Sequence, residues 1–236
     1  MDFDNLKEKF VYYLDKGIVQ DIYMSRLSYS LLMSIGKYGK QLEGTPYVLF
    51  FQNLQMILSD HLIVHITKLF EPIDKRYEVI SVPTTLQIIS ENVDNLEIIE
   101  RPLVCQHLAN LGILLNNSWS ITSAELNRII VDHFQSTMPS LDNSNSLLAL
   151  KVIRDKRIAH RELMDISGSP TTSFRDAYNL ITYAQNFVIV VGTAYTSTVH
   201  GFINEDFFLG EDAERSSLSL KNIINDLLKI SEEFVA

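Results

Sequence analysis

The feature that most constrains the fold of this chain is a helical hydrophobic period that recurs along nearly its whole length. Apolar residues return at spacings of three and four, as Leu6, Phe10 and Leu14 do, and this spacing places them on one face of an α-helix. The apolar–polar alternation that marks a half-buried strand is almost absent. Helix breakers are rare, with 9 glycines and 6 prolines in 236 residues. The sequence therefore predicts an all-α, multi-helix bundle.

Turn and capping residues divide this pattern into separate helices. We expect Gly17 to break or bend the first helix, and Thr45 to cap the helix that follows it, with Pro46 at the first helical position. The chain is long enough for one large domain, or for one domain with an appended helix. We place a bundle over 1–200, and an acidic surface loop (201–214) and an amphipathic helix packed on the bundle over 201–236. The expected helices cover 22–38, 47–70, 96–115, 174–199 and 218–234, with shorter ones after Asp4, Ser81, Thr122 or Ser123, and Asn145 or Ser146.

Charge and cysteine content narrow the functional classes. A net charge of −9 argues against nucleic-acid binding by the whole surface, so any such site must be a local basic patch. Cys105 is the only cysteine, which excludes an internal disulfide and a multi-cysteine metal site and favours a reducing, cytoplasmic location. The first residues are acidic and lack the basic region of a signal peptide. No apolar run approaches the ~20 residues of a membrane span, so we expect no membrane partner.

One basic segment stands out from this acidic chain. Five cations and His160 gather between Lys151 and Arg161, directly after an apolar helical run. On a straight helix, Arg154, Arg157 and Arg161 share one face. His160 lies about a third of a turn away and roughly 9 Å along the axis from Arg154, at ~1.5 Å per residue. A phosphodiester lying across the helix could touch both, and a distorted helix or a second copy across a dimer could supply a missing partner.

These residue types support phosphoryl chemistry without a metal or another cofactor. Histidine titrates near neutrality, so His160 can move protons to and from ribose and leaving-group oxygens. Arginine grips a phosphate with two donors and stabilises the more charged transition state. The remaining cations are interpreted as contacts to RNA backbone phosphates, namely Lys151, Lys156, Arg157 and Arg161. The alternative is a solvated basic helix end, stabilised by the helix dipole.

The same residues carry a resemblance to a known family. Arg154, Asp155 and His160 match the signature of the HEPN superfamily, an arginine followed by four to six residues and a histidine. The string Arg-Asp-Lys-Arg-Ile-Ala-His is most similar to the abortive-infection AbiU-type branch. Two other stretches agree, one from Leu58 to Glu71 and one that opens at Ser81 and carries Leu86 and Ile89. The resemblance covers roughly residues 27–199.

This resemblance implies a helical bundle of HEPN type, usually a homodimer whose two Arg/His motifs face each other. Many members are metal-independent endoribonucleases that act as toxins or antiviral effectors, and some are held by a cognate antitoxin or regulatory protein. Carried over, Arg154 and His160 are catalytic and Asp155 orients them. Glu162 stands where nucleotidylated members often have tyrosine, which argues against that regulation. The alternative is a catalytically inactive HEPN-like module that binds RNA, a nucleotide or a protein partner.

Other candidate residues have simpler interpretations. His61 and His65 lie four apart on one helix face, as metal ligands can, but the glutamate of an HExxH motif and a third ligand are missing. We therefore assign no metal. Asp60 is a polar residue in an apolar run, where it can support the site by pairing with Arg154 or Arg157, or stand as an exposed carboxylate. The tyrosines of the first third could stack on bases, but core packing explains them more simply (Tyr12, Tyr13, Tyr23, Tyr29 and Tyr38).

Overall fold

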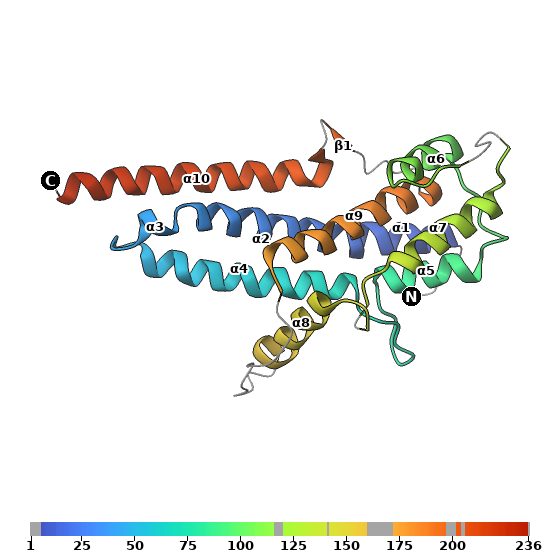
Figure 1. Ribbon diagram of the computed structural model, residues 1–236, viewed down its shortest axis with the longest axis horizontal. Helices are drawn as coiled ribbons and strands as arrows, with labels where there is room; N and C mark the ends of the chain where they lie inside the picture. Colours follow the sequence, from blue (N-terminus) through green and yellow to red (C-terminus); the bar gives the residue numbers. More distant parts are fainter. Residues whose placement is uncertain are drawn as a thin grey trace.

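A computed structural model describes residues 6–115, 120–140, 142–159, 172–196, 202–203 and 206–235. Within these ranges every long element is a helix, which confirms the all-α prediction (Figure 1). The one β-ladder is a two-residue antiparallel pairing. In chain order the elements are α1 (Leu6–Tyr13), the π-helix η1 (Leu14–Ile18), α2 (Val19–Lys37), α3 (Gly39–Leu42), α4 (Val48–Leu69), α5 (Val82–Glu91), α6 (Arg101–Asn110), α7 (Ser123–Thr137), α8 (Asn145–Ile153), the π-helix η2 (Arg154–Ala159), α9 (Phe174–Tyr195), β1 (Phe202–Ile203), β2 (Asp206–Phe207) and α10 (Phe208–Val235).

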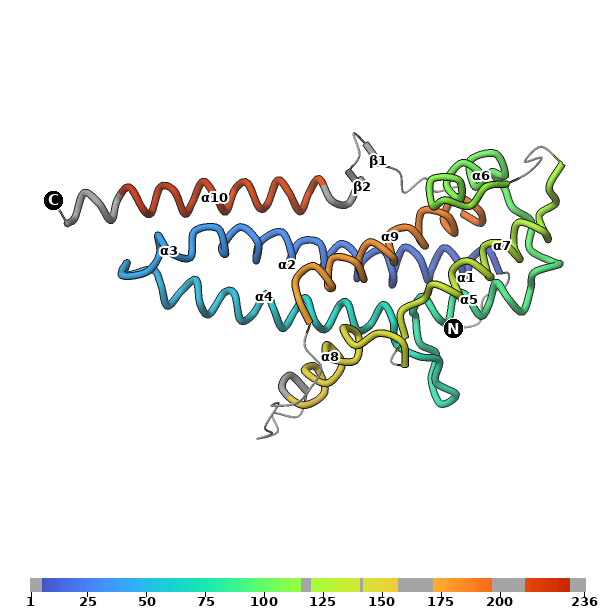
Figure 2. The backbone as a smooth tube through the Cα atoms, in the orientation of Figure 1, coloured from blue at the N-terminus to red at the C-terminus, as the bar shows by residue number. Residues whose placement is uncertain are grey.

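Three long helices form one end of the molecule, and shorter helices surround the other. Helices α2, α4 and α10 run side by side, while α5, α6 and α7 gather around the far end of α9 (Figures 1 and 2). Helix α8 leaves this body and lies against the second half of α4. The described part of the basic segment, residues 151–159, therefore lies at the edge of the bundle, next to the end of α4.

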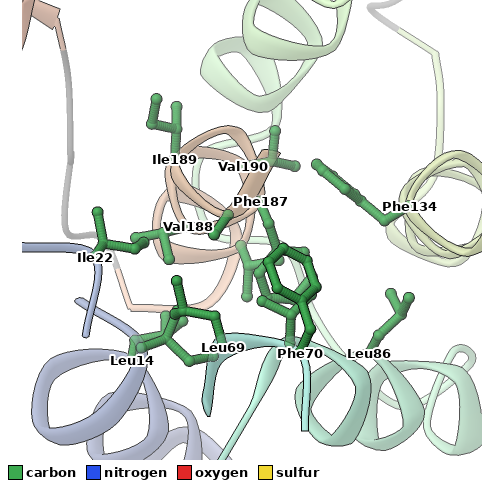
Figure 3. Packing of buried hydrophobic residues seen from close by; sticks show 14 of the residues in the cluster. Leu14, Ile22, Leu69, Phe70, Leu86, Phe134, Phe187, Val188, Ile189 and Val190 are labelled. Atoms are coloured by element: carbon green, nitrogen blue, oxygen red, sulfur yellow. The ribbon is translucent and has the colours of Figure 1, made fainter. Parts of the chain in front are cut away.

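Helix α9 is the centre of the main hydrophobic core. Its residues Phe187, Val188 and Val190 are completely buried, because side chains from η1, α2, α4, α5 and α7 meet around it (Figure 3). The rings of Phe134 and Phe187 pack edge to face, with centroids 5.1 Å apart. A helix that is apolar on all sides is stable only when it is enclosed in this way.

Capping side chains mark the starts of α5, α7, α8 and α9, and the sequence predicts the caps of α5 and α7. The Ser81 hydroxyl accepts a hydrogen bond from the backbone of Thr84 at the start of α5. Thr122 and Glu125 form a capping box on α7, which satisfies two otherwise unpaired backbone donors. The prediction for Thr45 and Pro46 is wrong, because the N-cap of α4 is Tyr47 and the helix begins at Val48. The Thr45 hydroxyl donates to the carbonyl of Leu42 and accepts from the backbone N–H of Tyr47, within the turn before the helix.

The break that was one of the two expected outcomes at Gly17 does not occur. Gly17 lies in η1, which joins α1 to α2 without a break. A Cβ at this position would lie 2.2 Å from Cγ2 of Ile80. Glycine is thus needed because the segment before α5 packs directly against the helix backbone.

The C-terminal helix is longer than the sequence predicts. The expected loop over 201–214 is wrong in its second half, because α10 begins at Phe208. Glu211 lies in its first turn, where a carboxylate favours helix formation by interacting with the helix dipole. Helix α10 packs along α2, and Ile224 joins a second buried cluster with Ile35, Leu42 and Phe51.

Boundaries of two other helices also differ. The helix expected over 96–115 is shorter, because α6 begins at Arg101 with Pro102 in its first turn, where the missing N–H costs nothing. Helix α9 ends at Tyr195. No helix in the described part of the chain combines the length and apolar character needed to cross a membrane.

Candidate functional site

The candidate site is built where α8 changes into the π-helix η2. Ser144 caps α8, and the buried Leu147 and Leu150 hold it against the bundle. From Arg154 to Ala159 the backbone is π-helical. Its hydrogen bonds span five residues, so the straight-helix spacing expected for Arg154 and Arg157 does not hold here. Such π-segments occur frequently at functional sites.

Two carboxylates hold the Arg154 guanidinium. Its Nη1 donates to Oε2 of Glu71 at 2.6 Å, and its Nε donates to Oδ1 of Asp155 at 2.8 Å. Glu71 follows directly after the C-cap of α4, so one anchor comes from each of two packed elements. The Arg154 side chain is 19 % exposed and the Glu71 side chain 27 %. Arg154 is therefore fixed at the surface with limited access to solvent.

This arrangement leaves part of the guanidinium available for a ligand. Arginine has five N–H donors, and Glu71 and Asp155 each take one of them within the described contacts. Burial opposes the charged form, but the hydrogen bonds from Glu71 and Asp155 outweigh it and raise the pKa of Arg154. Arg154 can thus present a permanent positive charge and further donors to a phosphate.

The other predicted site residues are placed only in part. Lys151 lies one turn before Arg154, with its Nζ 3.8 Å from Oε1 of Glu71. Lys156 is half-buried in η2. For Arg157 only the backbone within η2 belongs to the described structure, and His160 and Arg161 lie outside the described residues.

Glu71 is the site residue that the sequence analysis does not single out. It belongs to the stretch that resembles the family, but one acidic residue before a proline carries no signal of its contact with Arg154. Asp60, the expected supporting carboxylate, is half-buried in α4. It lies within the helix, eleven residues before Glu71, which follows the end of the helix. Its possible pairing with Arg157 involves a side chain outside the described structure.

A separate polar chain crosses the interface between α2 and α4. Nδ1 of His65 lies 2.6 Å from Oδ1 of Asp21, and Nε2 of His65 lies 3.1 Å from Nε2 of His61. Nδ1 of His61 lies 2.8 Å from the buried hydroxyl of Ser28, and Lys68 donates to Asp21. Burial, followed by the neighbouring His65, lowers the pKa of His61.

This row of hydrogen-bonded side chains explains why His61 and His65 lie four residues apart on one helix face. Both imidazoles use their ring nitrogens in hydrogen bonds with each other and with side chains of α2. Among the described residues, no group of three or more histidine, cysteine or carboxylate side chains is arranged to hold a metal ion. The pair therefore joins two helices of the scaffold.

The comparisons with known proteins agree with this architecture. A family model described as AbiU2, a HEPN domain, matches residues 7–215. The match runs from α1 into the first turns of α10 and includes α4, α8 and η2. It confirms the resemblance and extends it at both ends. Searches of curated proteins and of solved structures found no match.

Proposed function

Because the chain belongs to the AbiU2 family of HEPN domains, we propose that it is a metal-independent endoribonuclease of the toxin or antiviral-defence type, acting in the cytoplasm. One observation carries the proposal. Arg154 is clamped by Glu71 and Asp155 at the start of a π-helix, in the segment that leads to His160. The two carboxylates orient the Arg154 guanidinium, and its remaining N–H donors have no partner in the described structure.

The proposed reaction is attack of a ribose 2′-OH on the adjacent phosphorus. His160 takes the 2′-OH proton as the new O–P bond forms, and an imidazole returns a proton to the 5′-oxygen as the P–O5′ bond breaks. Arg154 neutralises the charge that develops on the phosphate oxygens. Asp155 and Glu71 hold Arg154 in position, and Lys151, Lys156, Arg157 and Arg161 contact the flanking phosphates.

An exposed apolar face on α4 supports the homodimer part of the proposal. Leu49, Phe50, Met56 and Ile57 are each at least half exposed, an unusual density for a free surface. These four residues lie in the first half of α4, whereas Glu71 follows its C-terminal end. Helix α8 and η2 cover only the second half of α4. A symmetric contact through this face, with the two α4 helices running parallel, would bring the two Arg154 segments to the same end of the dimer.

RNA cleavage in EDTA tests the nuclease directly. The wild-type protein should cut single-stranded RNA, and His160→Ala should lower the rate about 10²- to 10⁴-fold. Arg154→Ala should lower it about 10²- to 10³-fold. Arg128→Ala, which removes an exposed arginine from α7, is the matched control and should cut normally. RNA that is bound but left intact would instead identify a catalytically inactive binding module.

The dimer is tested separately by sedimentation. Ile57→Glu should dissociate the protein into monomers and abolish cleavage, since a charge cannot be buried at an apolar contact without a large cost. Ile223→Glu, on an exposed position of α10, should leave both properties unchanged.

A nuclease of this type also requires restraint, for which we propose a cognate antitoxin or regulatory protein.

A further inference from the structure

We propose that aromatic rings on α9 and α2 form a stacking platform for unpaired bases of single-stranded RNA. The proposal rests on the proposed nuclease function, and it adds where the strand lies beyond the cleaved phosphate. The platform consists of Tyr29 on α2 and of Phe174 and Tyr178 on α9.

The Tyr29 ring contacts the other two rings, and Phe174 and Tyr178 remain open to solvent, whereas Tyr29 itself is half-buried. Phe174 is 49 % exposed and Tyr178 is 39 % exposed, although both sit on the first turns of a helix whose other side is the protein core. The Tyr29 ring lies 6.3 Å from the Phe174 ring and 5.4 Å from the Tyr178 ring, between centroids. Tyr13, in contrast, packs within the core as the sequence analysis expects. Clustered, exposed ring faces are what unpaired bases stack on.

A buried arginine lies against the platform, and no carboxylate pairs with it among the described residues. The Arg26 guanidinium carbon lies 5.1 Å from the centroid of the Tyr178 ring, and the whole residue is only 8 % exposed. Its Nε has no hydrogen-bond partner in the described structure. Buried cations are usually paired, and the Arg26 guanidinium adds positive charge beside a ring on which an unpaired base can stack.

A groove continues from the platform between α2 and α10. It has a volume of about 570 Å³, and Tyr29 belongs to both the platform and the groove wall. Lys37, Arg215 and Lys221 line it together with Glu211 and Glu214. Arg215 pairs with Glu211, whereas neither lysine has a carboxylate partner among the described residues. These lysines can contact backbone phosphates of a strand whose bases stack on the rings.

The platform is connected to the Arg154 site through the start of α8. Helix α8, with Ser146 in its first turn, packs against α9, on which Asp176 lies between Phe174 and Tyr178. Arg154 follows eight residues after Ser146, about 12 Å further along the helix. In Figure 1 the start of α9 lies beside α2 and close to α8. A strand spanning a few nucleotides can therefore occupy both places.

The test measures binding of a short, single-stranded RNA with 2′-O-methyl groups, which cannot be cut by 2′-OH attack. Phe174→Ala and Tyr178→Ala should each raise Kd roughly 5- to 150-fold in fluorescence anisotropy, by the usual stacking contribution of one base. Phe174→Trp should retain binding. Tyr77→Ala removes an exposed ring elsewhere and is the matched control. Thermal unfolding of each variant checks that the fold is kept.

Salt dependence separates the rings from the groove. Lys221→Ala should reduce the slope of log Kd against log salt by about 0.7, the value for one phosphate contact on a single strand. Phe174→Ala should leave this slope unchanged. Unaltered binding in both alanine variants on α9, or duplex RNA binding as tightly as single-stranded RNA, would overturn the platform.

The outcomes also distinguish this proposal from the nuclease proposal. If Phe174→Ala and Tyr178→Ala still cut RNA and bind it as tightly as the wild-type protein does, the platform is refuted and the nuclease proposal stands. Binding that depends on the rings, by a protein that cuts no RNA, refutes the nuclease alone. A wild-type protein that binds no single-stranded RNA overturns the platform, and cleavage in EDTA then decides the nuclease independently.

Discussion

Replacing Glu71 by alanine should weaken both the fold and the proposed chemistry. The Glu71 carboxylate accepts a 2.6 Å hydrogen bond from Arg154, and both side chains are largely shielded from solvent. A hydrogen bond to a charged group contributes about 1.5–3 kcal/mol. Because the pair is only partly buried, we expect a loss of about 2 kcal/mol, or about 4–8 °C in Tm for a chain of this size.

The effect on cleavage follows from the geometry of the clamp. In Glu71→Ala the guanidinium keeps its bond to Asp155 through Nε but can rotate about it. A misplacement of about 1 Å costs on the order of 10²-fold, so we expect kcat to fall about 10- to 100-fold. Glu71→Gln keeps an oxygen acceptor, so its kcat should lie between those of the wild type and Glu71→Ala.

Asp94→Ala is the matched control, since it removes an Arg–carboxylate pair whose two side chains are 55 % and 74 % exposed. Exposed pairs contribute about 0.2–1 kcal/mol, so its Tm should change little and its cleavage rate should not change. The reasoning is refuted if Glu71→Ala behaves like Asp94→Ala in calorimetry and in the cleavage assay. Faster cleavage by Glu71→Ala would mean that Glu71 competes with phosphate for Arg154.

Two further predictions concern the scaffold. Gly17→Ala should destabilise the protein by about 1–3 kcal/mol, because the new Cβ would overlap Ile80. Gly36→Ala has open space around the new Cβ and should stabilise the protein by up to about 1 kcal/mol. Equal shifts in urea midpoint for the two variants would contradict the close packing. In the folded state, burial and then the neighbouring His65 lower the pKa of His61 from its ordinary 6.5. The contribution of neutral His61 to the free energy of unfolding should therefore be fully present above about pH 6.5 and be lost as the pH falls through the lowered pKa. His61→Gln should flatten part of that decrease between pH 7.5 and 5.5 in thermal unfolding, and an unchanged curve would show that His61 is not responsible.

Much of the fold follows from local sequence signals. Ser81 and Thr122 start helices because their hydroxyls accept bonds from unpaired backbone donors, and this chemistry is visible in the sequence. Thr45 offers the same residue type, but its hydroxyl serves the turn before α4. The start of α10 is missed because an acidic segment with a glycine has the composition of a loop, while its packing along α2 comes from a distant part of the chain.

The site is predictable only as far as it is local. Arg154 and Asp155 are neighbours, and their interaction can be anticipated from the signature. The contact between Arg154 and Glu71 joins residues 83 positions apart, so it depends on how α8 packs against α4. The π-helical backbone of η2 likewise has no clear sequence signal, and it changes which side chains share a face. Tyr29 could not be distinguished from the core tyrosines until its neighbours on α9 were known.

The chemical nature of the RNA ends tests the central claim most directly. Mass spectrometry of the fragments produced in EDTA should show 2′,3′-cyclic phosphate and 5′-hydroxyl ends, because the 2′-oxygen is the nucleophile and no metal-bound water is needed. These products should disappear in His160→Ala and Arg154→Ala and persist in Arg128→Ala. Fragments with 3′-hydroxyl and 5′-phosphate ends, or cleavage that survives in His160→Ala, would contradict the account.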